Sequence, residues 1–493
     1  MSEFEAATEL PTAPARRAFV AATAGAALVA AWVVPGSKPG AGIPILALVS
    51  GAAVHAARPR PISRTSWLFA AMGGALAVTA MLRAAEWVLA VNVLAALALA
   101  GFAATGATTW REMLWTPFAV LARVPQVPGY LRSGLRRPAA APSGRLAPVL
   151  RGLAIAAGLL VVFGVLFASA DPAFASLAGR LLIPDWDLDL MPLRVFVFAF
   201  AALAVGTLGL ARLRSEAGWT PSLRGMFSAG GAPWRLGRTE WTIALGALDL
   251  LFAIFVGIQI AVLFAGHDHV LRTEGLTYAE YTRQGFFQLL AVGVLTLGVL
   301  AVVGSRGERE GARDVRRLRL LGGTLCALTL VVLASAMHRL GLYEDAFGFT
   351  QARLTVQAVL WWLGAVFLLV VAAGATWRGA WLPRATVTLT AAGLLAFALA
   401  NPDAMVASRN VERFEGTGSL DLDYLGASMS ADAVPALMRL PEPYRACALA
   451  PIAARLGETE SWMEFNLGRS RARMLLDEAP PAVPEACPTG EGT

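Results

Sequence analysis

The stretch WTIALGALDLLFAIFVGIQIAVLFA, residues 241–265, decides the fold, because Asp249 is its only ionisable residue. A helix needs about 20 consecutive apolar residues to cross the ~30 Å hydrocarbon core of a bilayer. Buried helices of soluble proteins rarely sustain an apolar run of that length, so length is the informative property here. The stretch therefore predicts a transmembrane helix.

Ten other stretches are similar, which predicts an all-α, polytopic transmembrane helix bundle of about 11 spans. The eleven are residues 18–34, 42–57, 67–82, 87–104, 150–170, 191–213, 241–265, 285–303, 318–337, 352–373 and 384–400. Composition agrees, since 57% of the residues are hydrophobic and only 15% are charged, against about 25% charged in soluble domains. No small-residue cleavage site follows the first stretch, so we expect it to be a retained helix and not a signal peptide.

Basic residues gather in every second loop. They lie in residues 16–17, 58–64, 111–151, 212–238, 306–319 and 378–384. Because basic loops favour the cytoplasmic side, the N-terminus is predicted inside and the C-terminus outside. The chain then divides into a cytoplasmic tail (1–17), a transmembrane domain (18–400), an extracytoplasmic helical domain (401–478) and a flexible end (479–493).

The net charge of +7 comes almost wholly from arginine, and Lys38 is the only lysine. This bias is typical of GC-rich bacterial genomes, so we expect the inner membrane of a bacterial cell. The arginines lie beside hydrophobic runs, which indicates lipid headgroups as their partners. No basic stripe interleaved with aromatic residues indicates nucleic-acid binding.

The long cytoplasmic loop, residues 105–149, contains an amphipathic stretch. Trp110, Leu114, Phe118 and Leu121 share one helical face, opposite Arg111. The pattern favours a helix lying in the membrane interface, although a helix packed under the bundle would have the same pattern.

The C-terminal tail is more polar and reads as short helices. Ser430 can cap a helix that runs to residue 439, Pro443 can open the next, and Ser461 with Glu464 forms a capping box. Two of the three cysteines, Cys447 and Cys487, lie in this tail. The tail's predicted compartment is oxidising, so we predict a disulfide between them, and we expect Cys326 to be buried in a span.

Asp249 is the sharpest candidate for function inside the membrane. A charged aspartate at that depth costs about 2.5 to 3.5 kcal/mol, so it must be protonated, hydrogen-bonded or paired. It is either a proton or cation site, or one half of an interhelical hydrogen bond. Gln259, Asn92 and Gln357 leave the same two interpretations open.

The loop after this span, residues 266–287, contains further candidates. Thr277 and Glu280 form a capping box, and Tyr278 and Tyr281 suit the interfacial aromatic belt; Arg283 follows them. Residues 267–269, His-Asp-His, offer three ligands but no distant fourth one. We therefore predict no metal site.

Two other outer loops carry charge. One contains the acidic residues 344–345, near Arg339, Tyr343 and Arg353. The two arginines could bind an anionic lipid headgroup, or they could neutralise the acids. The acids Asp171, Asp185, Asp187 and Asp189 could serve a glycosyltransferase, or they could simply be solvated. No nucleotide-binding, hydrolase, zinc-protease or redox motif is present, so we expect no cofactor.

Three blocks resemble a family of bacterial membrane proteins known as domain of unknown function 4173. They are residues 255–259 followed by 276–287, residues 339–353, and residues 401–410 followed by 420–421 and 424–425. The third block contains Asn401, Asp403 and Asn410. Together they cover residues 241–437. The resemblance supports the topology and adds these three tail residues to the candidates, but it implies no reaction.

Three functions remain open. The first is a non-enzymatic envelope protein whose outer face is a platform for lipids or for an extracytoplasmic protein partner. The second is a transporter or flippase that uses Asp249 and Gln259. The third is a membrane glycosyltransferase that acts on a lipid-linked sugar through the outer acids, including Glu280.

The predicted topology is tested by fusions to the C-terminus. An alkaline phosphatase fusion should be active and a fluorescent-protein fusion dark, because the loop charges place this end outside. The opposite pair of results would overturn the topology.

Overall fold

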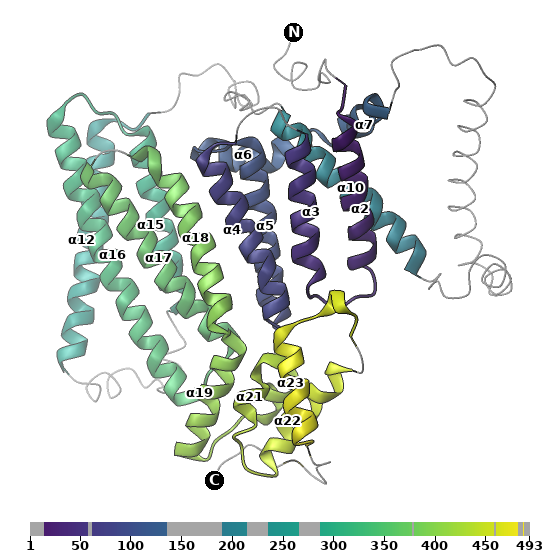
Figure 1. Ribbon diagram of the computed structural model, residues 1–493. Helices are drawn as coiled ribbons and strands as arrows, with labels where there is room; N and C mark the ends of the chain where they lie inside the picture. Colours follow the sequence, from purple (N-terminus) through teal and green to yellow (C-terminus); the bar gives the residue numbers. More distant parts are fainter. Residues whose placement is uncertain are drawn as a thin grey trace, which may run out of the picture. The chain divides into compact units, whose positions relative to one another are not determined.

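The computed structural model describes residues 14–57, 62–135, 190–213, 235–265, 286–376, 379–457, 460–481 and 487. These residues form an all-helical protein (Figure 1). Their one β-contact is an isolated bridge between Leu236 and Gly307. The predicted fold class is confirmed.

Eight of the described helices are long and apolar enough to cross a membrane. They are α4 (Arg64–Leu82), α5 (Glu86–Thr105), α10 (Met191–Leu213), α12 (Arg238–Ala265), α15 (Phe286–Arg306), α16 (Ala312–Phe347), α17 (Gln351–Thr376) and α18 (Leu382–Ala400). Two predicted spans are the shorter apolar helices α2 (Arg17–Val33) and α3 (Gly42–Ala56). The remaining predicted span, residues 150–170, lies outside the described residues.

Large apolar side chains point outward along these helices. Leu48 is 74% exposed, Leu94 67%, and Trp361 69%. Such surfaces would be unstable in water at this density, whereas lipid chains cover them without cost. The exposed apolar surface therefore supports membrane insertion independently of helix length.

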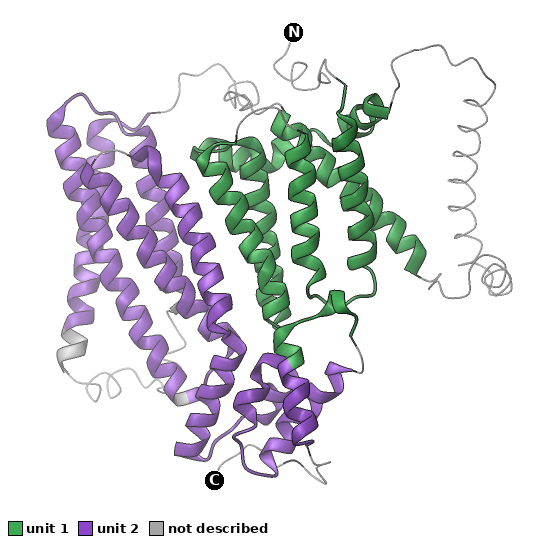
Figure 2. Cartoon of the chain, in the orientation of Figure 1, with its two compact units in different colours: residues 1–221, 458–470 green, residues 222–457, 471–493 purple. Residues whose placement is uncertain are grey.

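The chain forms two compact units (Figure 2). Unit 1, residues 1–221 and 458–470, contains α2, α3, α4, α5, α6 (Trp110–Leu121), η1 (Val124–Gln126), α7 (Val127–Leu135) and α10. In it α2 packs between α3 and α10, and Phe19, Tyr130 and Leu210 share a buried core.

Unit 2, residues 222–457 and 471–493, is built on α12, α15, α16 and α17, which share one apolar core. The α18 helix packs on α17 and leads into the tail. The tail helices are α19 (Pro402–Thr417), α20 (Leu422–Ser428), η4 (Ala431–Ala433), α21 (Val434–Leu437), α22 (Tyr444–Leu456), η5 (Trp462–Glu464) and α23 (Leu467–Glu478).

The two ends of unit 2 differ in charge. At one end Arg238 Nε lies 3.0 Å from Asp314 Oδ2, and Trp241 Nε1 donates to the Glu308 carbonyl oxygen. These contacts join the start of α12, the end of α15 and the start of α16, where arginines are dense. The tail residues of unit 2 pack at the other end of α16, where Asn410 bonds to Phe349. Within unit 2 the basic connection between α15 and α16 and these tail residues therefore lie at opposite ends.

Helix α6 turns its apolar residues outward. Leu114 is 71% exposed, Phe118 59% and Leu121 65%, while Met113 and Ala119 are buried against the unit. Helix packing under the bundle would have buried the first three. Their exposure favours the interpretation of α6 as an interfacial helix.

The tail contains the local features suggested by its sequence, with one difference. Ser461 and Glu464 form a capping box, and Pro443 precedes α22. Ser430 caps the short η4, which is followed by the four-residue α21. The helical stretch that Ser430 caps is therefore continuous from η4 into α21, and it ends at Leu437, two residues before the predicted end. The Sγ atoms of Cys447 and Cys487 form a disulfide, and Cys326 is free and buried.

Packing of α2 on α10 depends on Gly209. A Cβ at this position would lie 2.4 Å from Cζ of Phe19, a fully buried ring. Overpacking of this kind costs about 1–3 kcal/mol, so Gly209→Ala should lower the thermal unfolding temperature in detergent.

The matched control for this substitution is Gly25→Ala in α2. A Cβ there has no neighbour within 4 Å, and alanine is favoured over glycine in a helix by about 1 kcal/mol. The control should unfold at the wild-type temperature or above. Equal unfolding temperatures for the two variants would contradict the packing.

Candidate functional site

The structure brings several polar candidates of unit 2 together. They lie where the tail meets the connection between α16 and α17. Asn410, on α19, pairs with both polar groups of the Phe349 backbone. Its Oδ1 accepts from the Phe349 N–H at 3.1 Å, and its Nδ2 donates to the Phe349 carbonyl oxygen at 2.8 Å. The Asn410 side chain thus fixes α19 to the α16–α17 loop.

Asp403, at the start of α19, is fully buried. Its Oδ1 accepts from Gln351 Nε2 at 2.9 Å, and its Oδ2 accepts from the Ser430 N–H at 2.9 Å. A buried carboxyl is tolerated only when such donors replace its water. Asp403 therefore joins the first turn of α17 to the chain before η4.

Gln351 and Tyr424 extend this network. The Gln351 N–H donates to Tyr424 Oη at 2.7 Å, and Gln351 Nε2 also donates to the Ser428 carbonyl oxygen at 3.0 Å. Burial raises the pKa of the Tyr424 phenol, so this acceptor stays neutral at physiological pH. We call Gln351, Asp403, Asn410, Tyr424 and Ser430 the tail cluster.

Arg353 interacts electrostatically with Glu344, as one of the two sequence interpretations expected, and it has a further role. Its guanidinium donates to the carbonyl oxygens of Phe347, at 3.1 Å, and of Gly348. It also lies over the Tyr343 ring, 4.2 Å from the centroid. A cation at the C-terminus of a helix offsets the helix dipole, so Arg353 caps α16. Thr350 Oγ1 accepts from the Arg353 N–H and so caps α17.

Arg339 and Gln259 form an interhelical bond. Gln259 Oε1, on α12, accepts from Arg339 at 2.9 Å and from Ser335 Oγ at 3.0 Å, both on α16. In unit 1 Asn92 Nδ2 donates to Thr79 Oγ1 at 2.9 Å. Both contacts favour the structural interpretation of these amides, in which polar side chains join helices within the membrane.

Asp249 differs from these residues. It is 9% exposed, and within the described part of the chain neither of its carboxyl oxygens has a hydrogen-bond partner. It falls on the buried stripe of α12 between Leu245 and Phe252, which belong to the apolar core. Gln259 is ten residues further, about 15 Å along the helix. Asp249 and Gln259 therefore do not form one site.

Several candidates lie outside the described residues. They are Tyr278, Glu280, Tyr281, Arg283, residues 267–269, and the acids at 171, 185, 187 and 189. Among the described residues no three His, Cys, Asp or Glu side chains are placed to hold a metal. Asn401 is described, and it adopts a left-handed conformation with φ 61° between α18 and α19.

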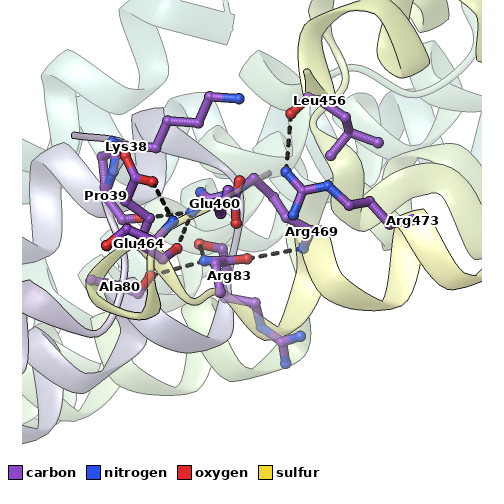
Figure 3. Close-up of polar contacts among 11 residues, drawn as sticks. Lys38, Pro39, Ala80, Arg83, Leu456, Glu460, Glu464, Arg469 and Arg473 are labelled. Carbon is purple, nitrogen blue, oxygen red and sulfur yellow. Dashed lines mark hydrogen bonds and ion pairs between the residues drawn. The ribbon is translucent and has the colours of Figure 1, made fainter. Parts of the chain in front are cut away.

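A second polar cluster, which sequence reasoning missed, lies in unit 1 (Figure 3). Arg469 Nε is 2.6 Å from Glu460 Oε1, and both side chains are about nine-tenths buried. Arg469 also donates to the Pro39 carbonyl oxygen at 2.9 Å. Asn466 Nδ2 donates to the carbonyl oxygens of Ala80, at 2.8 Å, and Arg83, at 2.7 Å. Residues 460–470 are thus bound to the α2–α3 and α4–α5 loops.

Two of the bonds that sequence reasoning missed join residues that are distant in sequence. Gln351 bonds to Asp403 across 52 positions, and Arg469 to Pro39 across 430. Gln351 could have been chosen as a candidate from the sequence, because it follows the capping residue Thr350 inside one of the resembling blocks. Glu460 and Arg469 carried no such signal.

Long lipid-facing helices joined by polar bonds define a multi-pass α-helical membrane protein. The sequence model of the family described as domain of unknown function (DUF4153) matches residues 70–440. The chain therefore belongs to that family. No curated protein and no solved structure matches the chain significantly.

The family match corrects the sequence interpretation. A domain of unknown function is confirmed, but its number is 4153 and not 4173. The resembling blocks are short runs rich in aromatic and arginine residues, which membrane interfaces favour in general. The match also begins at residue 70, so it includes much of the first half, in which the resemblance offered no motif.

The bonds of Asp403 in the tail cluster indicate that Asp403→Ala should loosen the tail. The change leaves the half-buried Ser430 N–H and the Gln351 side chain without their acceptor, and an unsatisfied buried donor costs about 1–3 kcal/mol. We expect faster proteolysis within residues 401–481 when the protein is held in lipid nanodiscs. Asp423→Ala removes an exposed carboxyl from α20 and should leave the rate unchanged. Cleavage of both variants at the wild-type rate would show that Asp403 does not hold the tail.

Proposed function

We propose that this protein is a non-enzymatic membrane protein whose C-terminal helical domain is a fixed platform for a lipid or protein partner. The observation that carries the proposal is the fully buried Asp403, bonded through both oxygens to Gln351 and Ser430. A tail that served only as a loose extension would not need a desolvated carboxyl at its base. The bonds instead give the domain one orientation on α17.

Other contacts support a platform. Arg455, near the end of α22, donates to the carbonyl oxygens of Ala427, at 3.1 Å, and Met429, at 2.7 Å. The Cys447–Cys487 disulfide closes the tail covalently. These bonds hold α20, α22 and the last described residue together, so the domain presents a constant surface to a partner.

The proposed location is the inner membrane of a bacterium, with the tail on the outer side. The arginine-rich loops support this orientation. The tail disulfide supports it independently, because such bonds persist in oxidising compartments.

Transport is a second candidate, and Asp249 is the observation that favours it. A carboxyl in an apolar helix interface with no hydrogen-bond partner in the described residues is costly, and residues of this kind often carry protons or cations. The distance between Asp249 and Gln259 weakens the case for a shared pathway. The glycosyltransferase alternative depends on acids outside the described residues and gains no support from the geometry.

Complementation of a deletion strain distinguishes the two candidates. The platform predicts that Asp403→Ala loses function while Asp249→Asn and the control Asp423→Ala retain it, at equal membrane levels. Transport predicts that Asp249→Asn loses function. Growth, lipid profile and membrane abundance are measured for each variant. Full function in Asp403→Ala cells with a demonstrably unfolded tail would overturn the platform.

A further inference from the structure

Residues 460–467 combine firm attachment with exposed apolar side chains. Trp462 is 67% exposed, Phe465 43% and Leu467 49%. The segment's acidic side chains are turned inward instead: Glu460 pairs with Arg469, and Glu464 Oε1 accepts from the Lys38 N–H at 2.8 Å. The segment thus satisfies its polar groups against the protein and offers its apolar ones to the surroundings.

Its attachment places the segment at the ends of membrane-spanning helices. The Ala41 N–H, one residue before α3, donates to the Phe465 carbonyl oxygen at 3.0 Å. A Cβ at Gly40 would lie 2.3 Å from the Glu464 carbonyl oxygen, so only glycine permits this approach. Asn466 binds carbonyls at the end of α4. Residues 460–467 therefore lie where helices α3 and α4 reach the edge of the bilayer.

Exposed tryptophans lie at both ends of the membrane-spanning helices of unit 1. Trp32, 53% exposed, ends α2 at the same end as residues 460–467. Trp67 and Trp110, 56% and 46% exposed, lie at the other end, near the start of α4 and the start of α6. The 20 residues of α5 connect the two ends and span about 30 Å, one hydrocarbon thickness. Exposed tryptophans at that spacing are typical of the two interfacial belts.

We propose that Trp462, Phe465 and Leu467 insert into the lipid interface and make residues 460–467 a membrane anchor within the C-terminal tail. The partner is the bilayer at the boundary between headgroups and acyl chains. A tryptophan favours that depth because its ring is apolar while its N–H can still bind water or a headgroup. The anchor is independent of what the platform binds, and its test measures depth, so the two proposals can fail separately.

The test places a fluorophore at the segment in the full-length protein. Trp462→Cys is labelled with an environment-sensitive dye and reconstituted into phosphatidylethanolamine and phosphatidylglycerol vesicles. Native Cys326 is buried, and the other two cysteines form a disulfide, so the new thiol is the one that reacts. The expected result is loss of emission with lipids that carry a quencher high on the acyl chain, and protection from aqueous iodide.

The control is Glu412→Cys, an exposed position on α19 about 15 Å along the helix from Pro402. A dye at this position should be quenched by aqueous iodide and not by the lipid-borne quencher. Leu467→Cys provides a second site if Trp462→Cys misfolds, and mass mapping of Cys447–Cys487 reports folding for every variant. Iodide quenching at residues 462 and 467 without lipid quenching would overturn the anchor. Protection from both quenchers would also overturn it, because the side chains would then face protein.

Discussion

The structure depends on a constraint set by hydrocarbon: a chain in the bilayer must satisfy every backbone polar group within itself. Helices meet this requirement, and the described spans are helical from end to end. The same constraint decides where side chains point, since Leu48 and Trp361 can face lipid freely while amides must find partners. Asn92 binds Thr79, and Gln259 binds Arg339. Each of these bonds fixes the rotation of one helix against its neighbour.

Two buried aspartates show how strongly the surroundings determine a residue's role. Asp403 receives hydrogen bonds on both oxygens at the end of the bundle, where backbone donors are available. Asp249 lies in the middle of a helix, where all backbone N–H groups are already used by the α-helix, and its neighbours Leu245 and Phe252 offer no donor. Asp403 is thereby explained by structure alone. Asp249 has no such partner among the described residues, so the apolar helix interface alone does not explain it.

Sequence reasoning succeeded where a property is local. Eight of the eleven predicted spans are helices long and apolar enough to cross a membrane, and two more are the shorter apolar helices α2 and α3. The Ser461–Glu464 box is a four-residue pattern. It failed where a property depends on distant partners. Nothing near Arg469 in sequence indicates Pro39 or a buried Glu460, and nothing near Asp403 indicates Gln351. The cap that Arg353 forms is local but was also missed, because the carbonyl oxygens to which it donates become available only once α16 ends at Phe347.

The path of the tail links its disulfide to its attachment. The chain leaves unit 2 after residue 457, is bound to unit 1 through residues 460–470, and returns to unit 2. Cys447 and Cys487, 40 positions apart, close a covalent loop around this excursion. A loop of that length restricts the unfolded chain by about 4 kcal/mol in the entropic account. The disulfide therefore stabilises the folded tail by lowering the entropy of the unfolded chain.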